Sequence, residues 1–204
     1  MLEFQIGQNA LDVCKVIVSN QAEISAIRLV AHEVDNNWRQ VHQTALEKLN
    51  NLLNSFEHSP PIKDQEYSRE EFSRLSLNKL NNLGENQVWS ITSRVRCSHG
   101  RIKHLPLMNF HPEEDVQNGI ISALRYICGN NNGALLDSGR FQHYYGDFLL
   151  DEHEWTQFMA EFLMPVFLVS PRYIGHRLYE GYSTLRLTSD NQYKPKIPEV
   201  IAVL

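Results

Sequence analysis

The residues of this chain that could carry chemistry gather in one short stretch, LLDSGRFQHYYG, at 135–146. Within six positions it holds a hydroxyl at Ser138, a glycine at Gly139, a guanidinium at Arg140 and an imidazole at His143. A guanidinium offers a planar fork for phosphate, and an imidazole N–H can donate to a phosphate oxygen. The stretch therefore predicts a phosphate-binding hairpin. The simpler alternative is a structural turn that uses glycine for its backbone freedom.

A second group of cations follows in the C-terminal third of the chain. Arg177 lies in SPRYIGHRLYEG, and Arg186 lies in the alternating segment YSTLRLT. Tyrosines interleave with these cations, and basic side chains mixed with aromatic ones are typical of surfaces that bind single-stranded nucleic acid. Arg177 and Arg186 are therefore predicted to join the hairpin residues in a site for nucleotides or phosphate. Ordinary amphipathic packing with solvated arginines is the alternative.

The periodicity around these residues predicts the elements that must position them. From residue 87 onward the order is strand, strand, helix, strand, strand, helix, a further helix or turn, and strand. Asp151 and Glu154 form a capping box at the second helix. This order predicts an α+β fold, with a palm-like or RRM-like mixed sheet on which helices pack. The strand that holds Asn109 is expected beside the strand that holds His143.

An apolar stripe runs through residues 24–56 in steps of three and four, which is the helical period. It predicts a long helix. The polar cluster at 35–37 leaves open a strand at 24–34 that is followed by a capped helix. Such a helix could dock a partner protein.

Prolines and charges at 59–71 predict a linker, within which Ser68 opens a short helix that reaches Leu80. The predicted organisation is a helical N-terminal region at 1–85 and an α+β domain at 86–204.

Composition excludes several classes of protein. The 204 residues are 42% hydrophobic and carry a formal net charge of -5, which argues against a globally basic nucleic-acid binder but not against a local basic groove. The three cysteines match no zinc or redox spacing, so a reduced, intracellular protein is expected. No apolar run reaches the length of a membrane span and no signal peptide is visible. A cytoplasmic protein that does not enter a membrane is therefore expected.

The segment SGRxxH, in this order of elements, resembles the second motif of the archaeo-eukaryotic primase (primase-polymerase) superfamily. In that superfamily a Ser-x-His or Ser-Gly-x-Gly-x-His segment spans the hairpin after the first strand-helix unit. SPRYIGHRLYEGYSTLRLT also resembles the C-terminal part of such domains. The resemblance covers roughly residues 87–190. It implies a palm-like sheet, a nucleoside triphosphate or nucleic acid as partner, and a role in DNA replication or repair.

The chain departs from the superfamily at the first motif, where a strand ends in two carboxylates that hold divalent metals. The corresponding strand, HLPLMNFH, carries Asn109 and His111 at the two same-face positions. The third motif is another acid, for which Ser170 is the best match here. Mg²⁺ prefers carboxylate oxygens, whereas an amide, an imidazole and a hydroxyl supply no negative charge. These departures predict a catalytically degenerate domain that binds nucleotide or nucleic acid.

Two alternatives remain open. Asn109, His111 and His143, with or without an acid from 113–115, would form a non-standard site for one Mn²⁺ or Zn²⁺, which accept imidazole. The protein would then be an active primase-polymerase or nuclease with Mg²⁺ or Mn²⁺ as cofactor. The acids at 113–115 have an ordinary explanation, because negative charge is favoured at a helix start. The other alternative is a protein-interaction module that uses the N-terminal helix.

Overall fold

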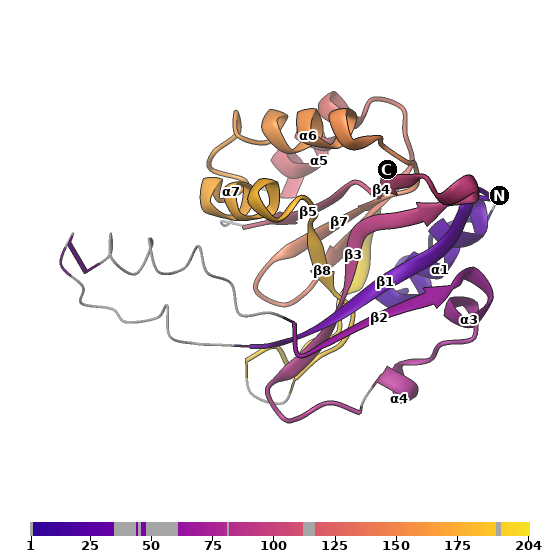
Figure 1. The fold of residues 1–204 in the computed structure, drawn as a ribbon. Helices are drawn as coiled ribbons and strands as arrows, with labels where there is room; N and C mark the ends of the chain where they lie inside the picture. Colours follow the sequence, from indigo (N-terminus) through magenta and orange to yellow (C-terminus); the bar gives the residue numbers. More distant parts are fainter. Residues whose placement is uncertain are drawn as a thin grey trace.

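The computed structural model describes residues 2–34, 44, 46–47, 61–80, 82–111, 117–190 and 193–204 (Figure 1). Its helices of four or more residues are α1 (Ala10–Asn20), α3 (Arg69–Ser73), α4 (Leu77–Leu80), α5 (Gln117–Cys128), α6 (Glu152–Glu161) and α7 (Pro171–Glu180). Its strands are β1 (Ile24–Glu33), β2 (Lys63–Ser68), β3 (Gln87–Cys97), β4 (Ile102–His104), β5 (Leu107–Phe110), β6 (Gly133–Asp137), β7 (Gln142–Gly146), β8 (Thr184–Arg186) and β9 (Glu199–Val203). The predicted α+β class is confirmed.

The described strands are divided between two antiparallel sheets rather than gathered in one mixed sheet. The first sheet has the order β2-β1-β3-β4, and β8 also pairs with β3. The second sheet has the order β5-β7-β6-β9. Because β1 pairs with β3 along its length, the part of the chain before residue 86 shares a sheet with the part after it.

Two hydrophobic clusters cover the two faces of the second sheet. On one face, Leu107, Leu136 and Tyr145 pack with α1, β1 and β3. On the other face, Met108, Leu135 and Tyr144 pack with α5, α6 and α7. Figure 1 shows these three helices grouped beside β5 and β7. Neighbouring residues of β7 therefore point into different environments, which is the alternation expected of a strand.

The long helix predicted from residue 24 is wrong for its first ten residues. Ile24–Glu33 is strand β1, which is the alternative that the sequence left open. It is flanked by β2 on one side and β3 on the other. Ile27, Leu29 and Ala31 are fully buried in this arrangement, and a strand buried in a sheet can mimic a helical apolar period over a short run. The rest of the predicted helix, apart from residues 44 and 46–47, lies outside the described residues.

The strand predicted across RIKHLPLMNF is two strands in two sheets. β4 pairs with β3, while β5 pairs with β7. Leu105 and Pro106 lie between them. The Leu105 N–H donates to Ser93 O of the first sheet at 2.8 Å, and Pro106 O accepts from Gly146 N–H of the second at 3.0 Å. After the chain passes from the first sheet to the second, Asn109 lies directly opposite His143. The prediction that their two strands are neighbours in one sheet is confirmed.

Local helix signals correspond closely to the structure. Ser68 with Glu71 and Asp151 with Glu154 form complete capping boxes at α3 and α6. The helix that Ser68 opens ends at Ser73, and α4 follows as a separate turn. Gly181 ends α7 in the left-handed region, with φ 72°. Within the described segments, no helix combines the length and apolar character that crossing a bilayer requires.

Candidate functional site

The SGR segment forms the tight turn between β6 and β7. Both the N–H and the hydroxyl of Ser138 donate to Phe141 O, at 2.9 and 2.8 Å. Gly139 adopts φ 96°, a conformation that favours glycine, and its N–H donates to Asp137 Oδ1 at 2.7 Å. Asp137 Oδ2 accepts from Lys196 Nζ at 2.6 Å. No motif in the sequence identified Asp137 as part of this turn. Ser138 and Asp137 therefore hold the turn in shape.

Asn109 and His143 are direct partners across β5 and β7, so their side chains share one face of the second sheet. Asn109 Oδ1 and His143 Nδ1 are buried, and neither has a hydrogen-bond partner among the described residues. Buried polar atoms are nearly always hydrogen-bonded. This pair is therefore a polar centre that a water or a ligand would complete.

His143 is uncharged at neutral pH in this environment. The side chain is 5% exposed, and burial together with the nearby charges of Arg186 and Lys194 lowers its pKa to about 3. A neutral imidazole donates one hydrogen bond and accepts one. His143 can therefore orient a ligand by hydrogen bonding, but it does not supply a positive charge.

An aromatic ring with two cations marks the tip of the hairpin. Arg140 Cζ lies 5.3 Å from the centroid of the Phe141 ring, and Lys194 Nζ lies 4.9 Å from it. The His111 ring packs edge-on against Phe141, with 4.5 Å between centroids. We call Arg140, Phe141, Lys194 and His111 the tip cluster. Lys194 has no motif that would have identified it from the sequence.

The tip cluster affects the protonation of His111. Burial, and then the charges of Arg140 and Lys194, lower the pKa of this half-buried imidazole. Its backbone N–H donates to Leu168 O at 2.9 Å, which ties the end of β5 to the segment before α7. His111 therefore contributes a largely neutral ring to a surface whose charge comes from the arginine and the lysine.

Arg186 lies beneath the turn rather than on the surface. It is 7% exposed, and its guanidinium donates to Thr188 O, Lys196 O and Ser138 O at 2.7, 2.6 and 2.7 Å. Burial lowers its pKa. Arg186 thus lies beside the hairpin, as the sequence predicted, but these three N–H groups hold main-chain carbonyls.

Arg177 is engaged within its own part of the fold. Its Nη1 donates to Thr184 Oγ1 at 2.8 Å and forms an ion pair with Glu180 at 3.1 Å. Its guanidinium also lies 5.7 Å from the centroid of the Tyr173 ring. None of these contacts reaches the hairpin, so a role of Arg177 in phosphate binding stays a prediction.

The donors at the first-motif positions do not fit a pair of carboxylate-bound metals. They are the amide of Asn109 and the imidazole of His111, and His143 is the nearest further donor in the strand pairing. Among the residues that the structure describes, no group of three or more His, Cys, Asp or Glu side chains is suited to a metal ion. The acids at 113–115 lie outside the described residues. Ser170 is the N-cap residue of α7, and its side chain makes no capping hydrogen bond.

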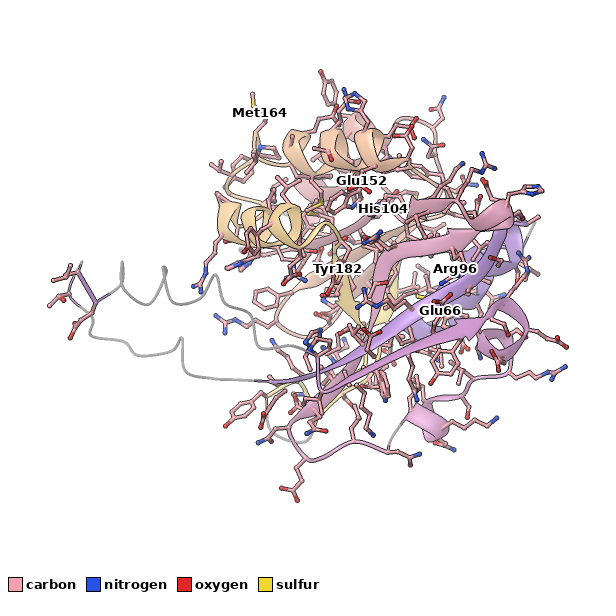
Figure 2. The ribbon with its side chains drawn as sticks, viewed as in Figure 1. Glu66, Arg96, His104, Glu152, Met164 and Tyr182 are labelled. Carbon is pink, nitrogen blue, oxygen red and sulfur yellow. The ribbon has the colours of Figure 1, made fainter. Side chains whose placement is uncertain are left out.

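A second polar network joins β3, β4 and α6. Ser93 Oγ lies 3.1 Å from His104 Nδ1. His104 Nε2 lies 3.1 Å from Glu152 Oε2, and Figure 2 labels both of these residues. The order of groups resembles a nucleophile triad. However, Ser93 and His104 are fully buried, and Ser93 Oγ accepts the Ser183 N–H at 2.9 Å. The His104 ring also stacks on the Trp155 ring, with 4.6 Å between the ring centroids. This network is a structural link that the sequence did not signal.

Comparison with known protein families identifies a related family. A family model described as archaeo-eukaryotic primase 1D-like matches residues 68–199, which is more than half of the chain. The matched range includes β5, the hairpin between β6 and β7, and β8. No curated protein and no solved structure matches the chain.

Proposed function

Because the chain belongs to the archaeo-eukaryotic primase 1D-like family, we propose that it is a primase-polymerase-like domain that binds phosphate groups of a nucleotide or of single-stranded nucleic acid. The proposed site is the tip of the β6–β7 hairpin. The observation that carries the proposal is the convergence of Arg140 and Lys194, from separate segments of the chain, on the ring of Phe141.

The tip cluster suits a phosphate beside a base. Arg140 is exposed at the turn and offers a planar fork, while Lys194 adds a second positive charge from the facing segment. Phe141 is partly exposed, and aromatic rings near basic residues stack bases. Gly139 allows the tight turn that presents Arg140, and its own N–H is donated to Asp137 Oδ1. Ser138 and Arg186 act beneath it by holding the turn.

The same site supports binding better than nucleotidyl transfer. In active enzymes of this chemistry, two divalent metals stabilise the attacking and leaving oxygens. Asn109 and His111 offer no negative charge to compensate such metals. We therefore propose that this domain binds its ligand without polymerising it. No observation on the described residues favours a metal-dependent enzyme. The helix predicted to dock a partner begins as strand β1, and most of its other residues lie outside the described ones.

The test is a titration of wild type, Arg140→Ala and Lys194→Ala with a labelled single-stranded oligonucleotide and with a nucleoside triphosphate. A charge-assisted hydrogen bond contributes about 1.5–3 kcal/mol, so each substitution should weaken binding about ten- to a hundredfold. Arg74→Ala is the matched control, because Arg74 is an exposed residue at the C-cap of α3 and pairs only with Glu70 in the ion pairs described. It should bind as wild type does.

Salt provides an independent readout for the oligonucleotide. Each phosphate contact removed should reduce the slope of log affinity against log salt by about 0.7 for a single strand. Equal affinities for wild type and both tip variants, or no binding by wild type, would show that SGRxxH is a structural turn. A loss in Arg74→Ala equal to that in Arg140→Ala would also count against a localised site.

A further inference from the structure

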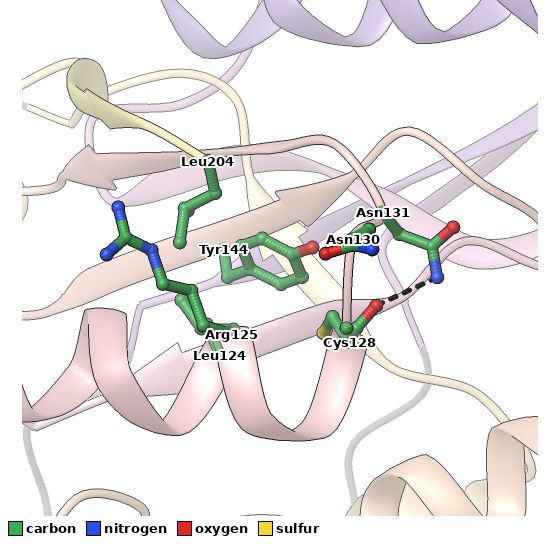
Figure 3. A pocket seen from close by; sticks show the side chains of 8 residues that line it. Leu124, Arg125, Cys128, Asn130, Asn131, Tyr144 and Leu204 are labelled. Atoms are coloured by element: carbon green, nitrogen blue, oxygen red, sulfur yellow. Dashed lines mark hydrogen bonds between the residues drawn. The ribbon is translucent and has the colours of Figure 1, made fainter.

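A cavity of about 330 Å³ lies on the helix-covered side of the second sheet, between the last turn of α5, Tyr144 and Leu204 (Figure 3). This volume lies within the range of small-molecule sites. Tyr144 belongs to the hydrophobic cluster of α5, α6 and α7, whereas Tyr145 belongs to the cluster on the opposite face. The cavity is therefore separated by the sheet from the face that carries Asn109 and His143.

The cavity contains a buried hydroxyl with only a weak partner, because the Tyr144 hydroxyl interacts with the Cys128 thiol. Tyr144 is fully buried, and no nitrogen or oxygen atom of the described residues hydrogen-bonds its hydroxyl. The ring owes its place to Gly133 and Gly146, which are paired across β6 and β7. A Cβ at Gly133 would overlap the Tyr144 ring, and one at Gly146 would lie 3.1 Å from the hydroxyl oxygen. A thiol is a weak hydrogen-bonding group, so a polar group of a ligand in the cavity would be a stronger partner for this hydroxyl.

Charge is distributed unevenly along the cavity. Arg125 is its one cationic lining residue, and no acidic side chain of the described part of the chain pairs with it. At the other end, Asn131 Nδ2 donates to Cys128 O at 2.9 Å, where α5 ends and its carbonyls carry partial negative charge. Burial raises the pKa of the Cys128 thiol to about 11, so this group is neutral. An anionic group is thus favoured at Arg125 and disfavoured at the helix end.

We propose that this cavity binds a small planar anion. Its carboxylate or phosphate group pairs with Arg125, its ring packs between Leu124 and Leu204, and a polar group at its far end meets the Tyr144 hydroxyl. Figure 3 shows the Arg125 guanidinium and the Tyr144 hydroxyl on opposite sides of the Tyr144 ring, as such a ligand requires. Because His143 precedes Tyr144 in β7, an occupant would contact the strand of the candidate phosphate site. The inference does not depend on that site.

The experiment uses benzoate, indole-3-acetate and phenyl phosphate as probes, followed in ¹H–¹⁵N NMR spectra of the full chain. Saturable shifts are expected at residues 124–131 and 144–146. Arg125→Ala should weaken indole-3-acetate binding at least about tenfold, because it removes a charge-assisted contact. The neutral analogue indole-3-ethanol should bind both proteins equally. Arg74→Ala is again the control, and Tyr144→Phe, checked for native folding, should weaken binding while it keeps the ring.

A chemical measurement provides a second test of the proposal. Of the three cysteines, Cys128 lines the cavity, whereas Cys14 and Cys97 belong to the other hydrophobic cluster. Because the thiolate is the reactive form, alkylation of Cys128 by iodoacetamide is followed at high pH, where bound indole-3-acetate should slow it. The proposal is overturned if none of the three anions gives saturable shifts, if the shifts lie outside the cavity, or if Arg125→Ala binds indole-3-acetate as tightly as wild type. Arg140→Ala should retain binding here, which separates this site from the hairpin.

Discussion

Asn109 and His143 face each other directly across β5 and β7, and each keeps one buried polar atom without a hydrogen-bond partner among the described residues. Unpaired atoms of this kind reduce stability unless a water or ligand completes them. The two residues also occupy the positions at which the resemblance to primases places the first and second motifs. The protonation of His143 and the metal binding of the Asn109 strand can therefore be tested directly.

Acid should destabilise wild type more than His143→Gln. The folded-state pKa of His143 is about 3, whereas a histidine in the unfolded chain titrates near its ordinary pKa of about 6.5. The unfolded state takes up the proton first, so the stability that neutral His143 contributes is full above pH 6.5 and is lost as the pH falls toward 3.

Urea denaturation at about pH 7.5 and about pH 5.5 measures this effect. Over that interval, wild type should lose about 1.4 kcal/mol more free energy of unfolding than the variant. His104 and His111 are present in both proteins, so their contributions cancel. Equal losses in both proteins would mean that His143 is not held neutral by the fold.

Restoring acids at the first motif should create a metal site. In the double variant Asn109→Asp with His111→Asp, two carboxylates would lie on one face at the end of β5, and Mn²⁺ prefers a site of that kind over an amide with an imidazole. Mn²⁺ should raise the melting temperature of the double variant but not that of wild type. Asn109→Leu with His111→Leu, which adds no charge, is the control. Comparable stabilisation of wild type by Mn²⁺ would contradict the proposed loss of the metal site.

Arg186→Lys should destabilise the protein although it conserves the charge. A lysine cannot reproduce the guanidinium that donates to Ser138 O, Thr188 O and Lys196 O. Leaving buried carbonyls unpaired costs at least about 2 kcal/mol in the free energy of unfolding, measurable by urea denaturation. Arg94→Lys, at an exposed position of β3, should change stability by less than about 0.5 kcal/mol. A similar small change in Arg186→Lys would rule out the anchoring role.

Glu152→Gln should lower the pKa of His104. Burial already lowers this pKa, and the neighbouring Glu152 carboxylate opposes the effect by stabilising the imidazolium. Without the negative charge of Glu152, nothing from this residue offsets the effect of burial. The NMR titration of the His104 ring should therefore move to lower pH. Glu161→Gln, at the other end of α6, should leave it unchanged. A constant pKa in Glu152→Gln would show that the 3.1 Å contact is not maintained in solution.

Local signals in the sequence were enough to predict much of this molecule. The capping residues at Ser68 and Asp151, the stop at Gly181 and the hairpin at Gly139 all act through hydrogen bonds and backbone conformations within a few residues. Strand alternation combined with the order of the elements placed Asn109 beside His143. These features depend on neighbours in the chain, so they can be recognised from the chain alone.

Contacts between distant segments decided the rest. Residues 24–33 became a strand because β2 and β3, far along the chain, pair with both of its edges. Lys194 joined Arg140 at Phe141, and Ser93 met Glu152 through His104, although no spacing in the sequence links them. Arg186 alternates like a surface residue but is buried, because the carbonyls of Ser138 and Lys196, from two other segments, meet around it. Such pairings follow from the packing of the two sheets, which periodicity along one segment does not encode.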